Sequence, residues 1–513
     1  FNFLNDEKEL EIPFEWNDTK QLKLWNFNLH YFDWARKFLE DSIENKEWNE
    51  KAIRLDFILD DWINKNLLGK GNGWSSYTTS LRARNWVWLF RCSPQLINQK
   101  RLDSLWHHII WINYNLELHI GGNHLIENLT SLIICCCQFE GRLSNRIYKK
   151  SLKLLEAELK YQILEDGGHE ERSASYHLLM LDRLIEVGCI LRLTNRETPD
   201  WLLSNIYKMF KWAKNIRIGK ENFPRFNDSP YDGCPNINII TDFAYCFLNN
   251  QLSNLKGLRS LLLENENILE NNYSPQITNY KAPFIDLPST GWTIIRPNKN
   301  WEFTFKCGKS CPDKLPGHAH SDLLSFDLFL DGQPIISETG TSIYGKSEIR
   351  KIERSLISHN TIQFAECKLN RKKIKWIEPI EIWGDFRAAR KASIIKRDAG
   401  IKNNNIFWVL GSHDGFNIIK ACHERYIELF INEKEDLIIN CIDKVNCEKD
   451  TLWRQFYHLG PNIRSSLFKE FYKSELNDKE YQFHTKETWY SKKFGERINR
   501  KSLFSTGKLN VGN

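Results

Sequence analysis

The sequence is short of the features that mark several protein classes. No Cys-x-x-Cys pair occurs among its 13 cysteines, which excludes a zinc knuckle, and their odd number and three consecutive members (135–137) show no disulfide framework. No apolar run reaches about 18 residues, the length that a membrane-spanning helix needs. A net charge of +6, from 71 basic and 65 acidic residues, is too small for a dedicated nucleic-acid binder. It is compatible with an anionic ligand in one groove.

What the sequence does have is length and aromatic side chains. Its 513 residues exceed the usual size of one domain, and 41% hydrophobic residues suffice for large cores, so we expect two or more globular domains. The 19 tryptophans either fill a helical core or stack on sugar rings, and the first use is the more frequent. Scattered cysteines favour a reducing, cytoplasmic setting. The chain starts at Phe1 rather than Met, so a removed signal peptide and a secreted or periplasmic location stay open.

Apolar spacing predicts helices up to about residue 270. Leu152, Leu155 and Leu159 step by three and four, as the buried face of a helix does. Glycine-bearing connectors, such as GKGNGWSSYT and EDGGHEERS, separate the helical stretches. This pattern predicts repeated helical hairpins, arranged as an array or toroid over residues 1–280.

A different pattern follows residues 271–291, an aperiodic stretch that contains Pro, Asn and Ser. Apolar and polar side chains alternate over residues 301–306 and again over 324–330, which run into the turn dipeptide Asp331-Gly332. Residues 435–445 are a further candidate strand. We therefore expect residues 281–513 to form an antiparallel β-sandwich, and the whole chain to be an α+β multidomain protein.

Two histidines open the β half, in the segment PGHAHSDLLSF. His318 and His320 enter a strand, where side chains two residues apart share a face. Glu338 and His359 follow downstream, and imidazole and carboxylate ligands suit Zn²⁺. The alternative is a set of polar histidines at a domain interface. A simple hairpin at 331–332 would leave Glu338 roughly 16 Å from His320, so a metal site requires the His320 loop to fold back.

Two segments of the helical half place polar side chains at predicted helix starts. Asn123 and His124 follow a Gly pair and precede an apolar stretch, where they could line a groove, although Asn123 would also suit a helix cap. The segment EDGGHEERSASYH contains Glu170, Arg172 and Tyr176. A capped, charge-rich helix start is the alternative explanation for that second cluster.

A third set of polar and aromatic side chains lies on two further helical stretches: Arg82, Arg84, Asn85, Trp86, His30 and Tyr31. In one interpretation the tryptophan lies in the core and the arginines lie at the surface. In the other, an arginine binds a carboxylate or sulfate while an aromatic ring supports a sugar, because a guanidinium fork matches such anions.

In order along residues 20 to 365, seven segments resemble the heparinase II/III superfamily of polysaccharide lyases: NLHYFDW, RARNW, GGNHLIEN, DGGHEERSASYH, GHAHSDLLSF, SETG and RSLISHNT. The resemblance implies an incomplete (α/α) toroid followed by an antiparallel β-sandwich, with the active site in the cleft between them. It also implies β-elimination on uronic-acid-containing polysaccharides, which leaves 4,5-unsaturated uronate ends. The implied substrates are alginate and glycosaminoglycans such as hyaluronan, chondroitin sulfate and heparan sulfate.

The resemblance also implies roles for single residues. Asn123 would neutralise the substrate carboxylate with His124 beside it, Tyr176 would be the catalytic tyrosine, and His318 a second acid/base group. The positions of a structural divalent metal, for which Zn²⁺ fits best and Mn²⁺ or Ca²⁺ stay open, match His320, Glu338 and His359. Many relatives have Asp where Glu338 stands, which changes the reach of that ligand. The expected substrate contacts are Arg82, Arg84, Asn85, Trp86, His30, Tyr31, Glu170, Arg172 and Arg354.

The chemistry of β-elimination explains these residue types. The carbanion formed at C5 of a uronate is poorly stabilised while the C6 carboxylate keeps its charge, so neutral or cationic donors must bind that carboxylate. A free tyrosine has a pKa near 10, and a tyrosinate base would need nearby positive charge. His318, Arg172 and His177 are the predicted sources of that charge.

Two rival functions remain open from the sequence. One is a glycoside hydrolase on a helical toroid, with a carboxylate pair drawn from Glu170, Glu171 and Asp228. The other is a non-catalytic protein that binds anionic polysaccharide during surface-glycan assembly. The oligomeric state is not indicated by the sequence.

Overall fold

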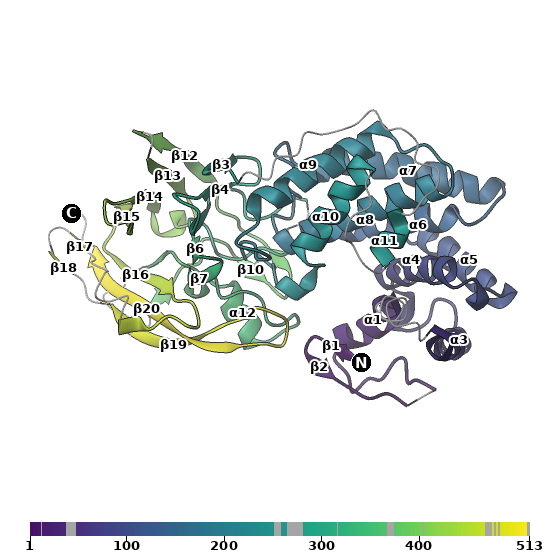
Figure 1. The fold of residues 1–513 in the computed structure, drawn as a ribbon. Helices are drawn as coiled ribbons and strands as arrows, with labels where there is room; N and C mark the ends of the chain where they lie inside the picture. The colour runs from purple at the N-terminus through teal and green to yellow at the C-terminus, as the bar shows by residue number, and fades with distance from the viewer. Residues whose placement is uncertain are drawn as a thin grey trace. The chain divides into compact units, whose positions relative to one another are not determined.

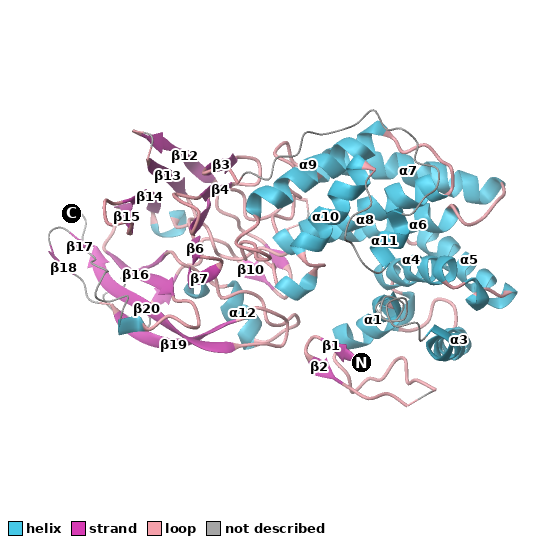
Figure 2. Ribbon diagram, viewed as in Figure 1, coloured by secondary structure: helices cyan, strands magenta, loops and turns pink. Residues whose placement is uncertain are grey.

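The computed structural model describes residues 1–11, 13–36, 48–250, 258–263, 281–314, 316–366, 374–403, 405–466, 475–476, 479–480 and 483–509. Helices dominate the first part of the chain and strands the second, as predicted (Figures 1 and 2). The chain forms two compact units, of which the first comprises Phe1–Ile163, Leu179–Phe210 and Ile239–Ile277. The second comprises Leu164–Leu178, Lys211–Asn238 and Thr278–Asn513. The domain limits 1–280 and 281–513 stay predictions, because residues 264–280 lie outside the described part.

The helices of the described chain are α1 (Lys23–Tyr31), α3 (Trp48–Lys65), α4 (Ser76–Cys92), α5 (Gln99–Tyr114), α6 (Gly122–Cys136), α7 (Arg142–Gln162), α8 (Ala174–Leu193), α9 (Asp200–Ile216), α10 (Ile237–Asn249), α11 (Leu258–Leu263) and α12 (Glu348–Arg354). None of the described helices is long and apolar enough to cross a membrane.

In the first unit, α6 packs against α4 and α7. Every residue of α6 except His124 is buried, because helices cover it on several sides. By contrast, α7 buries only one face, on which Ile147, Ser151, Leu155 and Leu159 follow one another at the four-residue spacing of an amphipathic helix. The centre of the unit also contains buried ion pairs, among them Arg183 Nε with Glu127 Oε2 at 2.8 Å. These ion pairs connect the helices in addition to the apolar packing between them.

The second unit contains three larger antiparallel sheets. One has the order β3 (Phe284–Leu287), β4 (Trp292–Ile295), β5 (Trp301–Lys306), β6 (Phe326–Leu330) and β7 (Gln333–Ile336). Another has the order β12 (Ile394–Lys402), β13 (Ile406–His413), β14 (Ala421–Ile431) and β15 (Leu437–Cys447). The third has the order β19 (His484–Tyr490), β20 (Ile498–Leu509), β16 (Thr451–His458), β8 (Ile362–Glu366) and β9 (Lys375–Trp376). The short pairs are β1 (Asn2–Phe3) with β2 (Asp6–Glu7), β10 (Ile382–Trp383) with β11 (Arg387–Ala388), and β17 (Glu475–Leu476) with β18 (Lys479–Glu480).

One apolar core joins all three larger sheets. Phe305 of β5, Val409 of β13 and Leu503 of β20 belong to the same buried cluster. This packing explains the alternating pattern that predicted the strands, since inward side chains of each sheet meet those of another.

The predicted hairpin at Asp331-Gly332 is present between β6 and β7. Leu330 pairs with Gln333, and the two turn residues have φ values of +49° and +76°, as a two-residue hairpin of this hand requires. The loop before β6 does fold back. His318 and Leu324 in this loop adopt φ values of +61° and +57°. The loop brings the His320 ring to 5.4 Å from that of His359, which is hydrogen-bonded to Glu338.

Candidate active site

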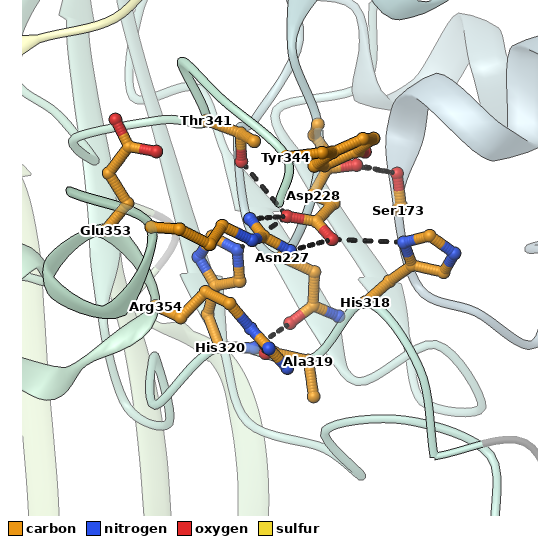
Figure 3. Close-up of polar contacts among 12 residues, drawn as sticks. Ser173, Asn227, Asp228, His318, Ala319, His320, Thr341, Tyr344, Glu353 and Arg354 are labelled. Atoms are coloured by element: carbon orange, nitrogen blue, oxygen red, sulfur yellow. Dashed lines mark hydrogen bonds and ion pairs between the residues drawn. The ribbon is translucent and has the colours of Figure 1, made fainter. Parts of the chain in front are cut away.

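A buried carboxylate, Asp228, is the centre of the polar cluster in the second unit (Figure 3). Its Oδ1 accepts hydrogen bonds from Arg350 Nη1 at 2.5 Å, His320 Nε2 at 2.9 Å and Thr341 Oγ1 at 3.2 Å. Its Oδ2 accepts from Arg350 Nη2 at 2.7 Å and His318 Nδ1 at 3.0 Å. The carboxylate therefore joins residues that lie 90 to 122 positions away along the chain.

The charge of Asp228 is stabilised by these donors. Burial alone would raise the pKa of this carboxyl, but the Arg350 guanidinium and the hydrogen bonds from His318 and His320 outweigh it and hold the pKa well below its usual range. Asp228 is thus ionised and paired with a bidentate arginine, the strongest geometry for such a pair.

The loop that carries Asp228 is fixed by the residue before it. Asn227 has a φ of +57°, which asparagine tolerates better than most residues. Its Nδ2 donates to the backbone oxygens of Arg172 at 3.1 Å and Ser310 at 3.0 Å. Its Oδ1 accepts from Lys306 Nζ at 2.7 Å and from the His320 backbone N–H at 3.2 Å. Four neighbours therefore determine where the adjacent carboxylate lies.

His318 lies between this carboxylate and a tyrosine. A carboxylate only accepts hydrogen bonds, so His318 Nδ1 donates to Asp228, and the tautomer with its proton on Nδ1 has its lone pair on Nε2. That Nε2 lies 3.9 Å from Glu171 Oε2. The ring centroid of Tyr176, the third residue of α8, is 4.1 Å from that of His318. The structure thus brings together the two residues that the sequence placed on different segments.

Tyr176 differs from expectation in its protonation. Its phenol oxygen is 3.1 Å from that of Tyr344. Burial, Tyr344 and the Asp228 charge all raise the pKa of Tyr176 well above that of a free tyrosine. Of the predicted sources of positive charge, His318 contacts the Tyr176 ring but directs its Nδ1 to Asp228, and Arg172 donates to the Glu170 backbone oxygen at 2.8 Å. The expectation of a lowered tyrosine pKa is therefore wrong for this arrangement, and the phenol is protonated.

The three predicted metal ligands lie near one another, but hydrogen bonds engage a polar atom of each. The ring centroids of His320 and His359 are 5.4 Å apart, and His359 Nδ1 is hydrogen-bonded to Glu338 Oε2. Ser325 Oγ donates to the other Glu338 oxygen, while His320 Nε2 is bonded to Asp228. Across the described residues no group of three or more His, Cys, Asp or Glu side chains is arranged to hold a metal. As placed they do not fit an ion, so the metal stays a prediction from the sequence and no step below uses it.

Asn123 and His124 belong to the first unit. Asn123 is the second residue of α6 and is buried, and the cap position is held by Gly121. The interpretation of Asn123 as a helix cap is therefore wrong. His124 keeps 34% of its side chain exposed, with Nδ1 at 3.2 Å from Glu117 Oε1 and its ring 4.4 Å from that of Tyr77. Their catalytic roles stay predictions.

The predicted contacts on α1 and α4 are mostly core residues. His30, Arg82, Arg84, Asn85 and Trp86 each expose no surface in this structure. Arg82 Nε donates to His108 Nε2 at 2.7 Å and its guanidinium lies 3.8 Å above the Trp62 ring. Burial lowers the pKa of His30 to about 3. Their positions support helix packing and give the ligand-binding role no support. Tyr31 is half-buried, with its ring 6.0 Å from that of Tyr77.

Three more predicted substrate contacts, Glu170, Arg172 and Arg354, take part in hydrogen bonds to backbone oxygens in the second unit. Arg172 Nη1 donates to the Glu170 backbone oxygen, and both residues are buried. Arg354 Nε donates to the Ala319 oxygen at 3.0 Å, and its Nη1 donates to that of Asp385 at 2.8 Å. The Arg354 guanidinium thereby fixes the histidine loop, and its role as a substrate contact stays a prediction.

Sequence reasoning missed three members of the cluster. Arg350 and Tyr344 lie in no recognised motif, and the sequence suggests Asp228 only as a hydrolase carboxylate. The dipeptide Asn227-Asp228 before Ser-Pro was the available signal, because it marks a turn in which Asn tolerates a positive φ. No spacing rule connects that turn to Arg350, which lies 122 positions further along the chain.

Two family profiles match the chain. The profile described as heparinase II/III N-terminus matches residues 3–253, and the one described as heparinase II/III-like, C-terminal, matches residues 279–511. A heparin-sulfate lyase from Bacteroides stercoris is 21% identical over 373 residues, which cover 69% of this chain and 51% of that protein. The FtsZ-localized protein C of Caulobacter vibrioides is 23% identical over 206 residues, which cover 39% of this chain and 34% of that protein. The chain thus spans about half the length, or less, of these relatives.

Solved structures confirm the predicted fold class. The crystal structure of heparinase III superposes with a TM-score of 0.71 at 14% identity, covering 98% of this chain and 78% of that one. A heparan sulfate lyase from Pedobacter heparinus gives a TM-score of 0.60 at 18% identity, with the same two coverages. The helical toroid followed by antiparallel β-sheets is the fold that they share with this chain.

Proposed function

The chain belongs to the heparinase II/III family, and on this premise we propose that it is a polysaccharide lyase that cleaves uronic-acid-containing polysaccharides by β-elimination. The observation that carries the proposal is the contact of the Tyr176 phenol ring with the His318 imidazole, which Asp228 orients. Heparan sulfate is the first substrate to test because two similar proteins are named for it. Hyaluronan, chondroitin sulfate and alginate are the others.

His318 is the proposed base. Its Nδ1 proton is held by Asp228, so the Nε2 lone pair is the acceptor that remains for the C5 proton of the uronate. The ionised Asp228 also stabilises the imidazolium that forms when that proton arrives. The raised pKa of Tyr176 disfavours the phenol as the base.

Tyr176 is the proposed acid. A phenol that is protonated before the reaction can donate to O4 as the bond between C4 and O4 breaks. The C5 proton passes to His318 Nε2, the electron pair forms the double bond between C4 and C5, and O4 leaves with the phenol proton. Tyr344, hydrogen-bonded to Tyr176, is placed to return a proton to it. The carboxylate-binding role of Asn123 rests on the family resemblance.

A substrate panel tests this function. Incubation with heparan sulfate, hyaluronan, chondroitin sulfate and alginate should give the ultraviolet absorbance of an unsaturated uronate with at least one polymer. Tyr176→Phe removes the acid and leaves the ring packing in place, so it should reduce the rate by about 10²- to 10⁴-fold with the fold intact. Tyr114→Phe, at a side chain that is 80% exposed, is the matched control and should retain full activity.

Different products would favour the two rival functions. Reducing ends without the chromophore would indicate a hydrolase, but Asp228 is a poor acid because its carboxylate is ionised and fully engaged. Polymer retention without any product, equal in the parent and Tyr176→Phe, would indicate a binding protein. One similar protein, FtsZ-localized protein C, has a name that does not describe a lyase.

A further inference from the structure

The hairpin formed by β10 and β11 is fixed against the histidine loop by one of its faces. Ile382 pairs with Ala388, and both pack into a small apolar cluster that includes Ala319 and Leu323, residues on either side of His320. The Ala388 backbone N–H donates to the Pro316 oxygen at 2.7 Å. This face explains why a strand pair of only two residues each keeps a defined position.

The tip of the hairpin borders the proposed catalytic groups. The Phe386 ring centroid lies 5.4 Å from that of His318 and 4.9 Å from that of Tyr344, in edge contacts. Arg350 Nη2 donates to the Asp385 backbone oxygen at 3.0 Å, so the arginine that binds Asp228 also holds the tip. Phe386, which directly precedes Arg387 in the chain, is therefore the hairpin residue that contacts both His318 and Tyr344.

The opposite face of the hairpin presents an indole and a guanidinium. Trp383 pairs with Arg387, and residues directly opposite on two strands project from the same face as close neighbours. Trp383 is 59% exposed, and Arg387 is exposed as well. The indole N–H donates to Glu381 Oε1 at 2.7 Å, which orients the ring. Among the residues that the structure describes, no hydrogen bond or ion pair engages the Arg387 guanidinium.

We propose that Trp383 and Arg387 form a subsite for anionic polysaccharide beside the reacting uronate. The flat indole offers an apolar surface to the C–H face of a pyranose ring, and the unengaged guanidinium offers a bidentate fork to a carboxylate or sulfate. Neighbouring aromatic and cationic side chains are what an acidic sugar requires, since one of its faces is apolar and its edge is charged. The inference rests on the proposed function and extends it to the recognition of a second sugar.

Binding is measured in the Tyr176→Phe background, so that the polymer is not consumed. Arg387→Gln and Trp383→Ala are compared with Lys444→Gln, which removes the same charge from an exposed position on β15. The probes are immobilised heparan sulfate and the same polymer after chemical desulfation. We expect Arg387→Gln to weaken retention by about tenfold, the effect of one lost charged hydrogen bond, and Trp383→Ala to weaken it by about as much through loss of the stacking surface. Lys444→Gln should leave retention unchanged.

The outcomes separate this inference from the proposed function. If Arg387→Gln weakens retention of the sulfated polymer alone, Arg387 binds sulfate. If it weakens retention of both polymers, Arg387 binds carboxylate, and either result supports the subsite. Retention equal to the background in Arg387→Gln, or an equal loss in Lys444→Gln, would overturn it. If the parent produces unsaturated uronate while the hairpin variants bind normally, only the subsite is wrong. A parent that binds no polymer and makes no product contradicts both.

Discussion

At the scale of single residues, Asp228 has the largest predicted effect. It fixes the tautomer of His318 and neutralises the buried Arg350. Asp228→Asn would place an amide donor against His318 Nδ1, move the ring proton to Nε2 and remove the base. We expect activity to fall by about a thousandfold or more, measured as unsaturated uronate formed well below the melting temperature.

The same substitution should also destabilise the chain. It leaves the Arg350 charge buried without its partner, which costs about 3–5 kcal/mol in the free energy of unfolding. Asp398→Asn, at an exposed carboxylate on β12, should change stability by no more than about 0.5 kcal/mol. Equal melting temperatures for the two variants would contradict the importance of the buried pair.

The residue identities of the catalytic pair could be predicted from sequence, but their environment could not. Tyr176 and His318 do meet, as their family motifs imply. The protonation of a catalytic side chain depends on the direction in which its neighbours point. Proximity in the sequence does not predict that direction. Arg172 is four residues from Tyr176 yet donates to backbone oxygens, while His177 stacks on Trp212 with ring centroids 4.1 Å apart.

At the scale of elements, turn chemistry was the most informative signal. The β6–β7 turn was predictable because Asp-Gly tolerates two positive φ values in succession. The sequence alone does not predict that the loop before β6 folds back; only the metal hypothesis requires it. The two positive-φ positions of this loop are His318 and Leu324, and neither is a glycine that would indicate a turn. Side-chain bonds to distant residues, rather than local preference, hold those two angles.

Gly332 in this turn provides a test of an element contact. Its φ is +76°, and an added Cβ would lie 3.1 Å from Gly219 Cα, a backbone atom that cannot move aside. Gly384→Ala has a similar left-handed φ of +55° with nothing within 4 Å of the added atom, so it should cost about 1–2 kcal/mol of backbone strain. Gly332→Ala should lower the thermal midpoint further than Gly384→Ala. Equal thermal midpoints for the two variants would show that the close approach of Gly332 to Gly219 does not contribute to the cost of the substitution.

At the scale of the whole molecule, buried carboxylates predict how stability varies with pH. Glu186 in the first unit and Asp443 in the second are buried, and burial would raise the pKa of each, but arginines outweigh it and lower both values. A lowered folded-state pKa gives stability that is complete above the unfolded value of about 4 and is lost as the pH falls below it. Asp327 acts oppositely, because burial and Glu338 raise its pKa to about 6, so its contribution is lost as the pH rises through that value.

We therefore expect the urea midpoint to fall between about pH 5 and about pH 3. Glu186→Gln should flatten that slope, because the glutamine cannot titrate. Unfolding monitored by circular dichroism at a series of pH values measures both effects. A midpoint that stays constant or rises on acidification would show that the arginine pairs do not set these pKa values.

The overall architecture was predictable because a change in hydrophobic period is visible in one sequence, from Leu155 and Leu159 in the helical part to Phe303 and Phe305 in the strands. The grouping of residues into compact units was not. Leu164–Leu178, which includes Tyr176, lies within the helical half of the sequence but groups with the β unit. Such assignments depend on packing between distant segments, which periodicity does not record.

The two hydrogen-bonding directions of Arg350 have a consequence for energetic coupling. The same guanidinium holds the carboxylate that orients His318 and the backbone oxygen at the hairpin tip. A sugar that displaced the Asp385 oxygen from Arg350 would therefore change the hydrogen bonds available at Asp228. Any factor by which that sugar changed the proton affinity of His318 would equal the factor by which protonation of His318 changed the affinity for the sugar, because such linkage is reciprocal. Sugar binding at the hairpin and protonation at the imidazole would then report the same coupling free energy.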